Sequence, residues 1–194
     1  NALEVKDAID VLAGRTQGDL LEISLLLGSH MLVLAEKAKT LPEARAMLEN
    51  ALSSGAGLRK LAEMIAAQGG DPRVVEDLSL LPKAAVKRVM RAETAGYLSA
   101  MDTTALGMAA QRMGAGRAKK SDMLDYSVGY VLHVRLGDEV TEDTPLATLY
   151  ARNEAEAEEA EKAIRKALTI AKEKPQTPKL WDAVVTAEGI IYNR

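Results

Sequence analysis

Apolar side chains recur at helical spacing through the first eighty residues. Four of them, at i, i+3, i+4 and i+7, place one apolar face on a helix that ends at Gly14: Val5, Ala8, Ile9 and Leu12. Residues 20–37 are apolar on most sides, which predicts a central helix. Two further stripes predict helices over about 44–52 and 58–65, the first behind a capping-box pair, Thr40 and Glu43. Residues 1–80 therefore read as a helical layer without strands.

A different pattern begins near Leu81-Pro82. Short segments rich in β-branched or aromatic side chains predict strands at residues 86–90, 96–101, 126–134 and 147–150. Between the second and third of these, Thr103-Thr104 is placed to cap a short helix. Residues 81–194 are thus expected to form a second region, and the chain as a whole is assigned to the α+β class.

A long helix is expected after Asn153. Its first half is rich in glutamate and its second half in lysine and arginine, the order that the helix dipole favours. Its inward stripe keeps helical spacing through Ala160, Ala163, Ile164, Ala167, Leu168 and Ala171. We interpret the glutamates as a solvated face rather than a cation site. After Lys174-Pro175 the tail is expected to be an extended segment packed on the surface.

Composition narrows the classes of function. The 194 residues are 47% hydrophobic and 27% charged with a formal net charge of −3, the balance of a soluble globular protein. Cysteine is absent, which excludes disulfides, thiolate nucleophiles and cysteine-ligated metals in this chain. Near-neutral charge and few aromatics argue against nucleic acid as a partner. No signal peptide is recognisable, and the most apolar stretch, residues 20–34, is shorter than the roughly 20 residues of a membrane span, so we expect a cytoplasmic protein without a membrane partner.

No catalytic constellation stands out. Both histidines, His30 and His133, lie in apolar segments, which favours hydrogen-bonded core histidines over catalytic ones. The one glycine-rich candidate for an anion site is Gly114-Ala115-Gly116-Arg117, followed by Lys119-Lys120. These glycines come after a predicted helix, where the dipole has the wrong sign for phosphate. A helix C-cap followed by a mobile basic loop is therefore favoured over a phosphate site.

The stretch from Gly137 to Ala147 resembles the Gly-Asp-x-Val…Leu-Ala segment of biotinyl and lipoyl carrier domains. Those carriers modify a lysine that is usually flanked by methionines, and no Met-Lys-Met occurs in this chain. The resemblance implies a small hammerhead or barrel-sandwich β fold in the second region, without the carrier chemistry.

Blocks in order over nearly the whole chain resemble the C-terminal half of pyrimidine-nucleoside and thymidine phosphorylases. They are residues 1–8 (Asn-Ala-Leu-Glu-Val-Lys-Asp-Ala), 27–31, 34–35, 66–71, 81–82, 101–102, 106–107, 114–117, 125–129 and 136–138. The resemblance implies a parent enzyme that cleaves a pyrimidine nucleoside with phosphate to free base and pentose 1-phosphate. It also implies a homodimer with no required cofactor, in which a helical domain and a larger α/β domain flank the substrate cleft. Residues 1–80 would belong to that α/β domain, and 81–194 would form the C-terminal phosphorylase domain.

The same resemblance places the essential groups outside this chain. The family's Lys-His-Ser-Thr-Gly-Gly-type phosphate loop and its base-binding Arg, Ser and Lys lie before the point that Asn1 matches, and none of these motifs occurs here. We therefore expect a fragment that lacks the N-terminal half, contains no catalytic or substrate-binding residue and is inactive alone. The loop with Gly114, Gly116 and Arg117 corresponds to a region near the segment that orders when the cleft closes.

One ligand of the family matches a residue of this chain. Its monovalent-metal site, for potassium, uses two backbone carbonyls upstream of the Asn-Ala-Leu-Glu-Val motif and an acidic side chain after that motif, which corresponds to Asp7. The family usually has Glu there, and an exposed helix carboxylate is an equally good interpretation. A function of another class, a non-enzymatic binding or scaffold module with a carrier-like β domain, also stays open.

Overall fold

The computed structural model describes residues 1–193, which divide into two compact units. Unit 1 contains residues 1–4 and 81–177, and unit 2 contains residues 5–80 together with the chain from Pro178 onward. The chain thus passes from unit 2 to unit 1 between Leu80 and Leu81. This division differs at both ends from one into residues 1–80 and 81–194, because the first four residues group with unit 1 and the tail groups with unit 2.

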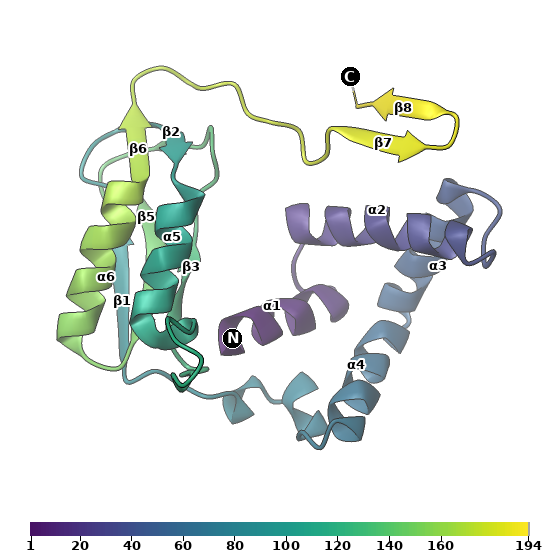
Figure 1. The fold of residues 1–194 in the computed structure, drawn as a ribbon, viewed down its shortest axis with the longest axis horizontal. Helices are drawn as coiled ribbons and strands as arrows, with labels where there is room; N and C mark the ends of the chain where they lie inside the picture. The colour runs from purple at the N-terminus through teal and green to yellow at the C-terminus, as the bar shows by residue number, and fades with distance from the viewer. Residues whose placement is uncertain (194) are drawn as a thin grey trace. The chain divides into compact units, whose positions relative to one another are not determined.

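Residues 2–67 form the four helices that the apolar spacing predicts (Figure 1). They are α1 (Ala2–Leu12), α2 (Asp19–Leu34), α3 (Leu41–Ser53) and α4 (Ala56–Ala67), followed by two short 3-10 turns at Pro72–Val75 and Leu78–Leu80. Gly14, with φ of 70°, follows α1 as a left-handed residue that only glycine adopts easily. The core between α1, α2 and α3 is built by Val11, Leu21 and Leu25, against which Leu48 and Leu52 pack.

The α2–α3 connection differs slightly from expectation. Helix α2 ends at Leu34 rather than near residue 37, because Glu36 takes a left-handed φ of 55°. The predicted cap of α3 is present, with the Thr40 hydroxyl accepting from the Glu43 backbone N–H at 3.3 Å. In a capping box the glutamate carboxylate accepts a hydrogen bond from the N–H of the capping residue itself. Here the Glu43 carboxylate accepts instead from the N–H of Lys39, the residue before Thr40, at 2.8 Å.

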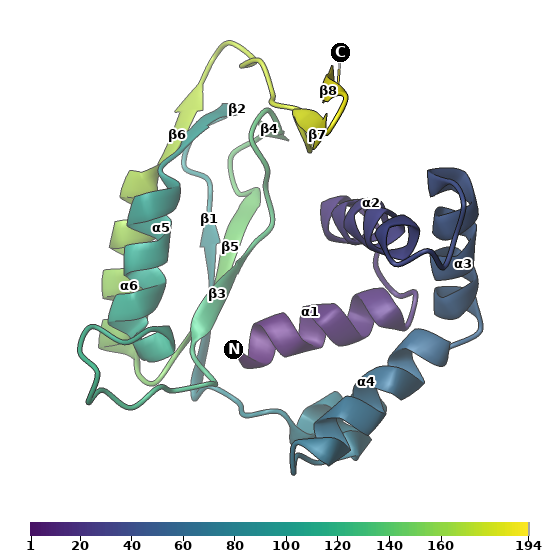
Figure 2. The same cartoon turned by 45° about the vertical axis from the view of Figure 1, so that its right-hand side comes forward.

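Unit 1 is built from two small antiparallel sheets and two helices, which confirms the α+β class. The first sheet has the order β1 (Val86–Arg91), β5 (Pro145–Ala151), β3 (Gly129–Leu132). The second has the order β4 (Glu139–Val140), β2 (Gly96–Met101), β6 (Leu168–Ala171). Helices α5 (Thr103–Ala110) and α6 (Glu154–Ala167) lie side by side over one face of the first sheet (Figure 2).

The core of unit 1 lies between these helices and the sheets. Met90, Leu98, Leu149 and Ile164 are all fully buried in it. Alternation along β1 turns Met90 and Arg88 to the helix side, and the Arg88 guanidinium pairs there with Glu154 of α6 at 3.1 Å. Within residues 1–193, every helix falls short of the length and apolarity needed to cross a bilayer.

Three expectations about unit 1 are wrong in detail. Helix α5 is capped by Asp102, whose carboxylate accepts from the Ala105 N–H at 2.9 Å, rather than by the threonines. The strand expected at 126–134 is limited to 129–132. Helix α6 ends at Ala167, because residues 168–171 pair with β2 as strand β6.

The tail is also more ordered than an extended segment. Strands β7 (Ala183–Thr186) and β8 (Gly189–Tyr192) form a two-stranded hairpin around a two-residue turn. The turn lacks the Asn-Gly or Asp-Gly signal that makes hairpins easy to recognise from sequence. The two apolar runs, Val184-Val185 and Ile190-Ile191, face each other across the hairpin.

Candidate functional site

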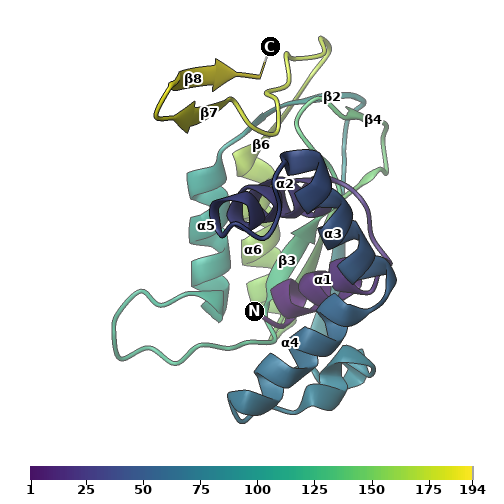
Figure 3. The same cartoon turned by 90° about the vertical axis from the view of Figure 1, so that its right-hand side faces the viewer.

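A hollow of about 500 Å³ in unit 1 brings together the start of α1, the end of α5 and the loop that follows α5. Its lining includes the candidate loop residues Gly116 and Arg117, together with Leu3, Glu4, Gln111 and Tyr130. Figure 3 shows the loop running out from the end of α5 before it returns to β3. Two of the loop residues singled out from the sequence, Gly116 and Arg117, therefore line a concave surface.

The glycines reshape the end of α5. After Ala110 the chain makes a wider π turn over Gln111–Ala115, within which Gly114 has φ of 100°. A side chain at Gly114 would adopt a strained backbone conformation and approach the guanidinium of Arg152, 3.6 Å from the Cβ position. The glycines therefore end the helix, as predicted, and the π turn redirects the chain into the loop.

Local hydrogen bonds hold the basic loop. The Gln111 side-chain amide donates to the Arg117 carbonyl oxygen at 2.6 Å, closing a ring around both glycines. Farther on, one oxygen of the Asp122 carboxylate accepts from the N–H groups of Ala118 and Lys119, at 3.1 and 2.8 Å. These backbone donors are thus already occupied by the loop itself. That arrangement agrees with the C-cap interpretation and leaves the side chain of Arg117 exposed.

The return of the loop toward β3 is fastened by Asp125. Its carboxylate accepts from the Ser127 hydroxyl at 2.6 Å and from the Ser127 N–H at 2.9 Å, and these bonds lower the pKa of Asp125 below its usual value. The Asp125 N–H also donates to the Gly114 carbonyl at 3.0 Å. The backbone bond joins the two ends of the loop at Gly114. The Asp-x-Ser spacing was a sequence signal for the local turn at Asp125, but not for this longer-range bond.

The floor of the hollow is formed where α1 begins and β3 starts. The Ala2 N–H donates to the Tyr126 carbonyl at 2.9 Å, which ties the start of α1 to the end of the loop. Gly129 has φ of 143°, and the Leu3 side chain lies 3.5 Å from its Cβ position. The Tyr130 hydroxyl donates to the Leu106 carbonyl at 2.7 Å, and burial raises the pKa of this tyrosine.

Asp7, the candidate metal ligand, lies exposed on α1. Three residues later Asp10 is 6% exposed, with Lys6 at 2.5 Å and Arg15 at 2.7 Å from its carboxylate oxygens. Burial opposes the charged form of Asp10, but the hydrogen bonds from Lys6 and Arg15 outweigh it and lower its pKa. Within residues 1–193, no three His, Cys, Asp or Glu side chains gather to hold a metal ion. The pairing of Asp10 was not foreseen, although its basic partners stand at i−4 and i+5.

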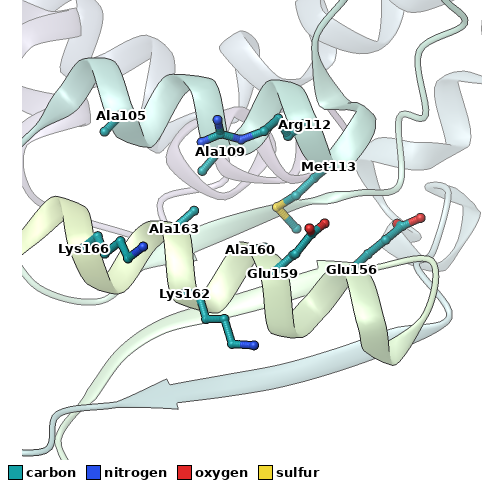
Figure 4. Close-up of a pocket in the computed structure, with 10 residues that line it drawn as sticks. All are labelled: Ala105, Ala109, Arg112, Met113, Glu156, Glu159, Ala160, Lys162, Ala163 and Lys166. Atoms are coloured by element: carbon teal, nitrogen blue, oxygen red, sulfur yellow. The ribbon is translucent and has the colours of Figure 1, made fainter.

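A second hollow, of about 450 Å³, lies between α5 and α6 (Figure 4). Its floor is Ala105, Ala109, Ala160, Ala163 and Met113, so it exists because small side chains face each other across the two helices. Two of the charged groups on its rim form ion pairs with nearby residues, one within α6 and one with the residue that precedes its N-cap. Lys162 binds Glu158 at 2.6 Å, and Glu156 binds Arg152 at 2.9 Å. These two ion pairs stabilise α6.

The two histidines occupy different environments. His30 is half-buried on α2, and His133 is exposed just after β3. The Nε2 atom of His133 lies 2.7 Å from the hydroxyl of Thr148, a residue that is only 6% exposed. The hydrogen bond agrees with the expectation for His133, but its exposure does not, because a core histidine would be buried.

Comparison with known proteins identifies the chain's relatives. Residues 97–171, which include α5, α6 and the loop, match the family model of the pyrimidine nucleoside phosphorylase C-terminal domain. A pyrimidine-nucleoside phosphorylase of Bacillus subtilis is 48% identical over 154 residues, 79% of this chain. The chain matches the C-terminal domain of the pyrimidine-nucleoside phosphorylases. The proteins of that name from Geobacillus stearothermophilus and Staphylococcus aureus are 47% and 42% identical, over 79% and 88% of this chain.

The chain spans only part of these phosphorylases. The matched region is 36% of the Bacillus and Geobacillus proteins and 39% of the Staphylococcus protein. The region that matches the phosphorylase domain model contains the whole loop around Gly114, Gly116 and Arg117. Asp7 lies outside that region.

Proposed function

We propose that this chain is the C-terminal part of a pyrimidine-nucleoside phosphorylase. Such an enzyme is a pentosyltransferase that cleaves a pyrimidine nucleoside with phosphate, giving the free base and pentose 1-phosphate. The observation that carries the proposal is the 48% identity over 154 residues to a curated pyrimidine-nucleoside phosphorylase.

We further propose that the 194 residues alone do not perform this reaction. Phosphorolysis requires cationic and hydrogen-bonding groups around the phosphate and around the base on which negative charge develops. Among the described residues that line the hollow beside the loop, Arg117 is the one cationic side chain, and Glu4 lies in the same lining. A carboxylate in the same hollow opposes the binding of phosphate. The groups that hold both substrates are accordingly assigned to the rest of the enzyme.

The loop around Gly114, Gly116 and Arg117 is proposed to act in closure of the substrate cleft rather than in direct binding. Closure excludes water and commits the substrates to reaction. The loop has the parts that such a movement needs: glycines at its base and a basic side chain exposed at its start. Its backbone N–H groups at Ala118 and Lys119 already bind Asp122, which argues against their holding phosphate.

Three further features belong to the same proposal and rest on the family resemblance. They are a homodimeric enzyme, a cytoplasmic location and a monovalent cation such as potassium near Asp7. Asp7 is exposed on α1, so its carboxylate is free to be joined by oxygen ligands from other parts of the enzyme.

The proposal is tested with the chain alone and with a chimera. In the chimera, these residues replace the matching segment of the Bacillus subtilis phosphorylase. Uridine and thymidine are incubated with phosphate, and released base is measured. We expect no release by the isolated chain and phosphorolysis by the chimera, with the Bacillus protein lacking that segment as the control. A folded but inactive chimera contradicts the proposed function, and turnover by the isolated chain contradicts its proposed inactivity.

A further inference from the structure

The loop after α5 begins beneath a side chain of another element, Arg152. A Cβ atom at Gly114 would lie 3.6 Å from Nη1 of Arg152 and 3.7 Å from both Cζ and Nη2. A position almost equally far from these three atoms lies over the flat face of the guanidinium and not at its edge. The guanidinium therefore covers the bare backbone of Gly114, as a planar group of this kind can.

The returning end of the loop reaches the same place. The Asp125 N–H binds the Gly114 carbonyl at 3.0 Å. The hydrogen bonds from Ser127 are the main reason that the pKa of Asp125 is lowered, and the positive charge of Arg152 lowers it further. In turn, the pKa of Arg152 is raised chiefly by Glu156 and also by Asp125. Arg152 and Asp125 thus attract each other across the base of the loop.

The backbone that carries Arg152 is held at both sides. Arg152 stands between Ala151, the last residue of β5, and Asn153, the N-cap of α6. Ala151 is buried and pairs with Val86 of β1, and Asn153 caps the helix through the Glu156 N–H. The Glu156 carboxylate also accepts from Nε of Arg152 at 2.9 Å, which orients the guanidinium. Arg152 is therefore a fixed point beside two movable ends of chain.

We propose that Arg152 is a positioning residue for closure of the substrate cleft, a role that deepens the proposed function and rests on it. Its guanidinium holds the two ends of the loop together, by its face over Gly114 and by its charge near Asp125. A loop that is held at its base loses less conformational freedom when it closes than a loose loop does. Arg152 thereby favours closure by acting through the loop.

The competing role for Arg152 is to stabilise α6 through its ion pair with Glu156. The two roles use different parts of the guanidinium, because Glu156 binds at Nε whereas Gly114 lies under the flat face. A variant of Glu156 therefore removes the pair with α6 and leaves the contact with the loop. This makes Glu156→Gln the matched control for Arg152→Gln.

Trypsin cleavage of the loop in the 194-residue chain is the first test, because Arg117, Lys119 and Lys120 are trypsin sites. Arg152→Gln should be cut there about two- to fivefold faster than the parent chain, as expected for loss of one exposed charge contact. Glu156→Gln should be cut at a rate within about 1.5-fold of the parent. Mass spectrometry assigns each cut, and the unfolding temperature of both variants should stay near that of the parent.

Two further measurements separate this contact from general destabilisation. In about 1 M salt, where the Debye length is about 3 Å, the excess cleavage of Arg152→Gln over the parent should shrink. In a background that carries Asp125→Asn, Arg152→Gln should have a clearly smaller effect than it has alone, because one partner of the attraction is already gone. Additive effects of these two substitutions, or an excess that salt leaves unchanged, would contradict the proposed role of the charge.

Kinetics of the chimera described above test the link to the reaction. Arg152→Gln should lower kcat/KM by about two- to fivefold, in step with the faster cleavage of the loop, while Glu156→Gln should leave kcat/KM near the parent value. Loop cleavage at the parent rate in Arg152→Gln, or an equal effect of Glu156→Gln, would overturn the proposal. So would a loosened loop with unchanged kcat/KM. A chimera that is inactive without any substitution contradicts the proposed function, whereas the cleavage rates do not depend on turnover and still decide whether Arg152 holds the loop.

Discussion

The side-chain amide of Gln111 donates a 2.6 Å hydrogen bond to the carbonyl oxygen of Arg117, six residues farther along the chain. This bond closes the base of the loop around Gly114 and Gly116, neither of which has a side chain that could stiffen it. The base of the loop is thus held by this side chain together with the bond from the Asp125 N–H to the Gly114 carbonyl.

Gln111→Ala is expected to loosen this loop without unfolding the domain. Loss of one hydrogen bond to an exposed carbonyl costs about 0.5–1.5 kcal/mol locally. Limited proteolysis should therefore cut residues 114–121 faster than in the parent chain. Gln68→Ala, at the exposed end of α4, is the control and should leave that rate unchanged. An unchanged rate in Gln111→Ala would mean that Asp122 and Asp125 alone hold the loop.

Arg117→Ala, made in the full-length enzyme, is expected to lower turnover by less than about tenfold, which is under about 1.4 kcal/mol in the barrier. The reason is that an exposed loop charge biases closure and does not touch the reacting atoms. Thermal stability should stay the same, because exposed charges contribute little to folding. Complete loss of activity would instead make Arg117 a direct ligand, and unchanged kinetics would leave it only as part of a helix C-cap.

The loops of the chain should be cleaved before its helices. Limited proteolysis is expected to begin near residues 69–82 or in the loop 114–121, where backbone is exposed between elements. Helix α6 should resist cleavage, because Ala157, Ala160 and Ile164 bury its inner face. Mass spectrometry of the earliest fragments identifies the first cleavage sites. First cleavage within residues 154–167 would contradict this prediction.

Asp10→Asn should destabilise the helical unit by about 1–3 kcal/mol, because it removes the charge that satisfies Lys6 and Arg15 at a buried position. The pKa of Asp10 is lowered in the folded state, so its contribution is fully present above the unfolded pKa. It is lost as pH falls through the lower, folded value. Urea unfolding from pH 7 down to pH 2 should therefore show the two proteins converging in acid.

Asp7→Asn is the matched control for that series. The exposed Asp7 carboxylate lies on the same helix, and its loss should change the free energy of unfolding by no more than about 0.5 kcal/mol at any pH. A pH-independent difference between Asp10→Asn and the parent chain would show that the effect comes from packing rather than from the ion pairs.

Local patterns predicted much of this fold because they coincide with the packing. The apolar spacing of Val5, Ala8, Ile9 and Leu12 predicted α1, and Asn153 predicted the start of α6. The Asn153 side-chain oxygen does cap this helix, accepting a hydrogen bond from the Glu156 N–H at 2.9 Å. The end of α6 could not be found in this way. Ala171 continues the apolar spacing of the helix, but Ile170 pairs with Leu98, a partner 72 residues away that no local window contains.

The residues of the candidate site could be recognised from the sequence, but the contacts that hold them could not. Composition drew attention to Gly114, Gly116 and Arg117, since glycines beside a basic residue are conspicuous in a sequence. The hydrogen bonds that fix this region could not be predicted from the sequence. The Tyr130 hydroxyl donates to the Leu106 carbonyl, 24 residues away, and the Ala2 backbone N–H donates to the Tyr126 carbonyl, from which it is separated in sequence by all four helices α1 to α4. Bonds between residues so far apart in sequence become apparent only in the folded chain.

Helix α6 passes into strand β6 without a connecting residue, since Leu168 is at once the cap of the helix and the first residue of the strand. The Asp102 N–H binds the Ala167 carbonyl at 2.8 Å, so the junction is also fastened from outside. Side chains of a strand alternate between its two faces, and one inserted residue here would turn every side chain of β6 to the wrong face. An extra residue between Ala167 and Leu168 would therefore have to break either the pairing of β6 with β2 or the last turn of α6.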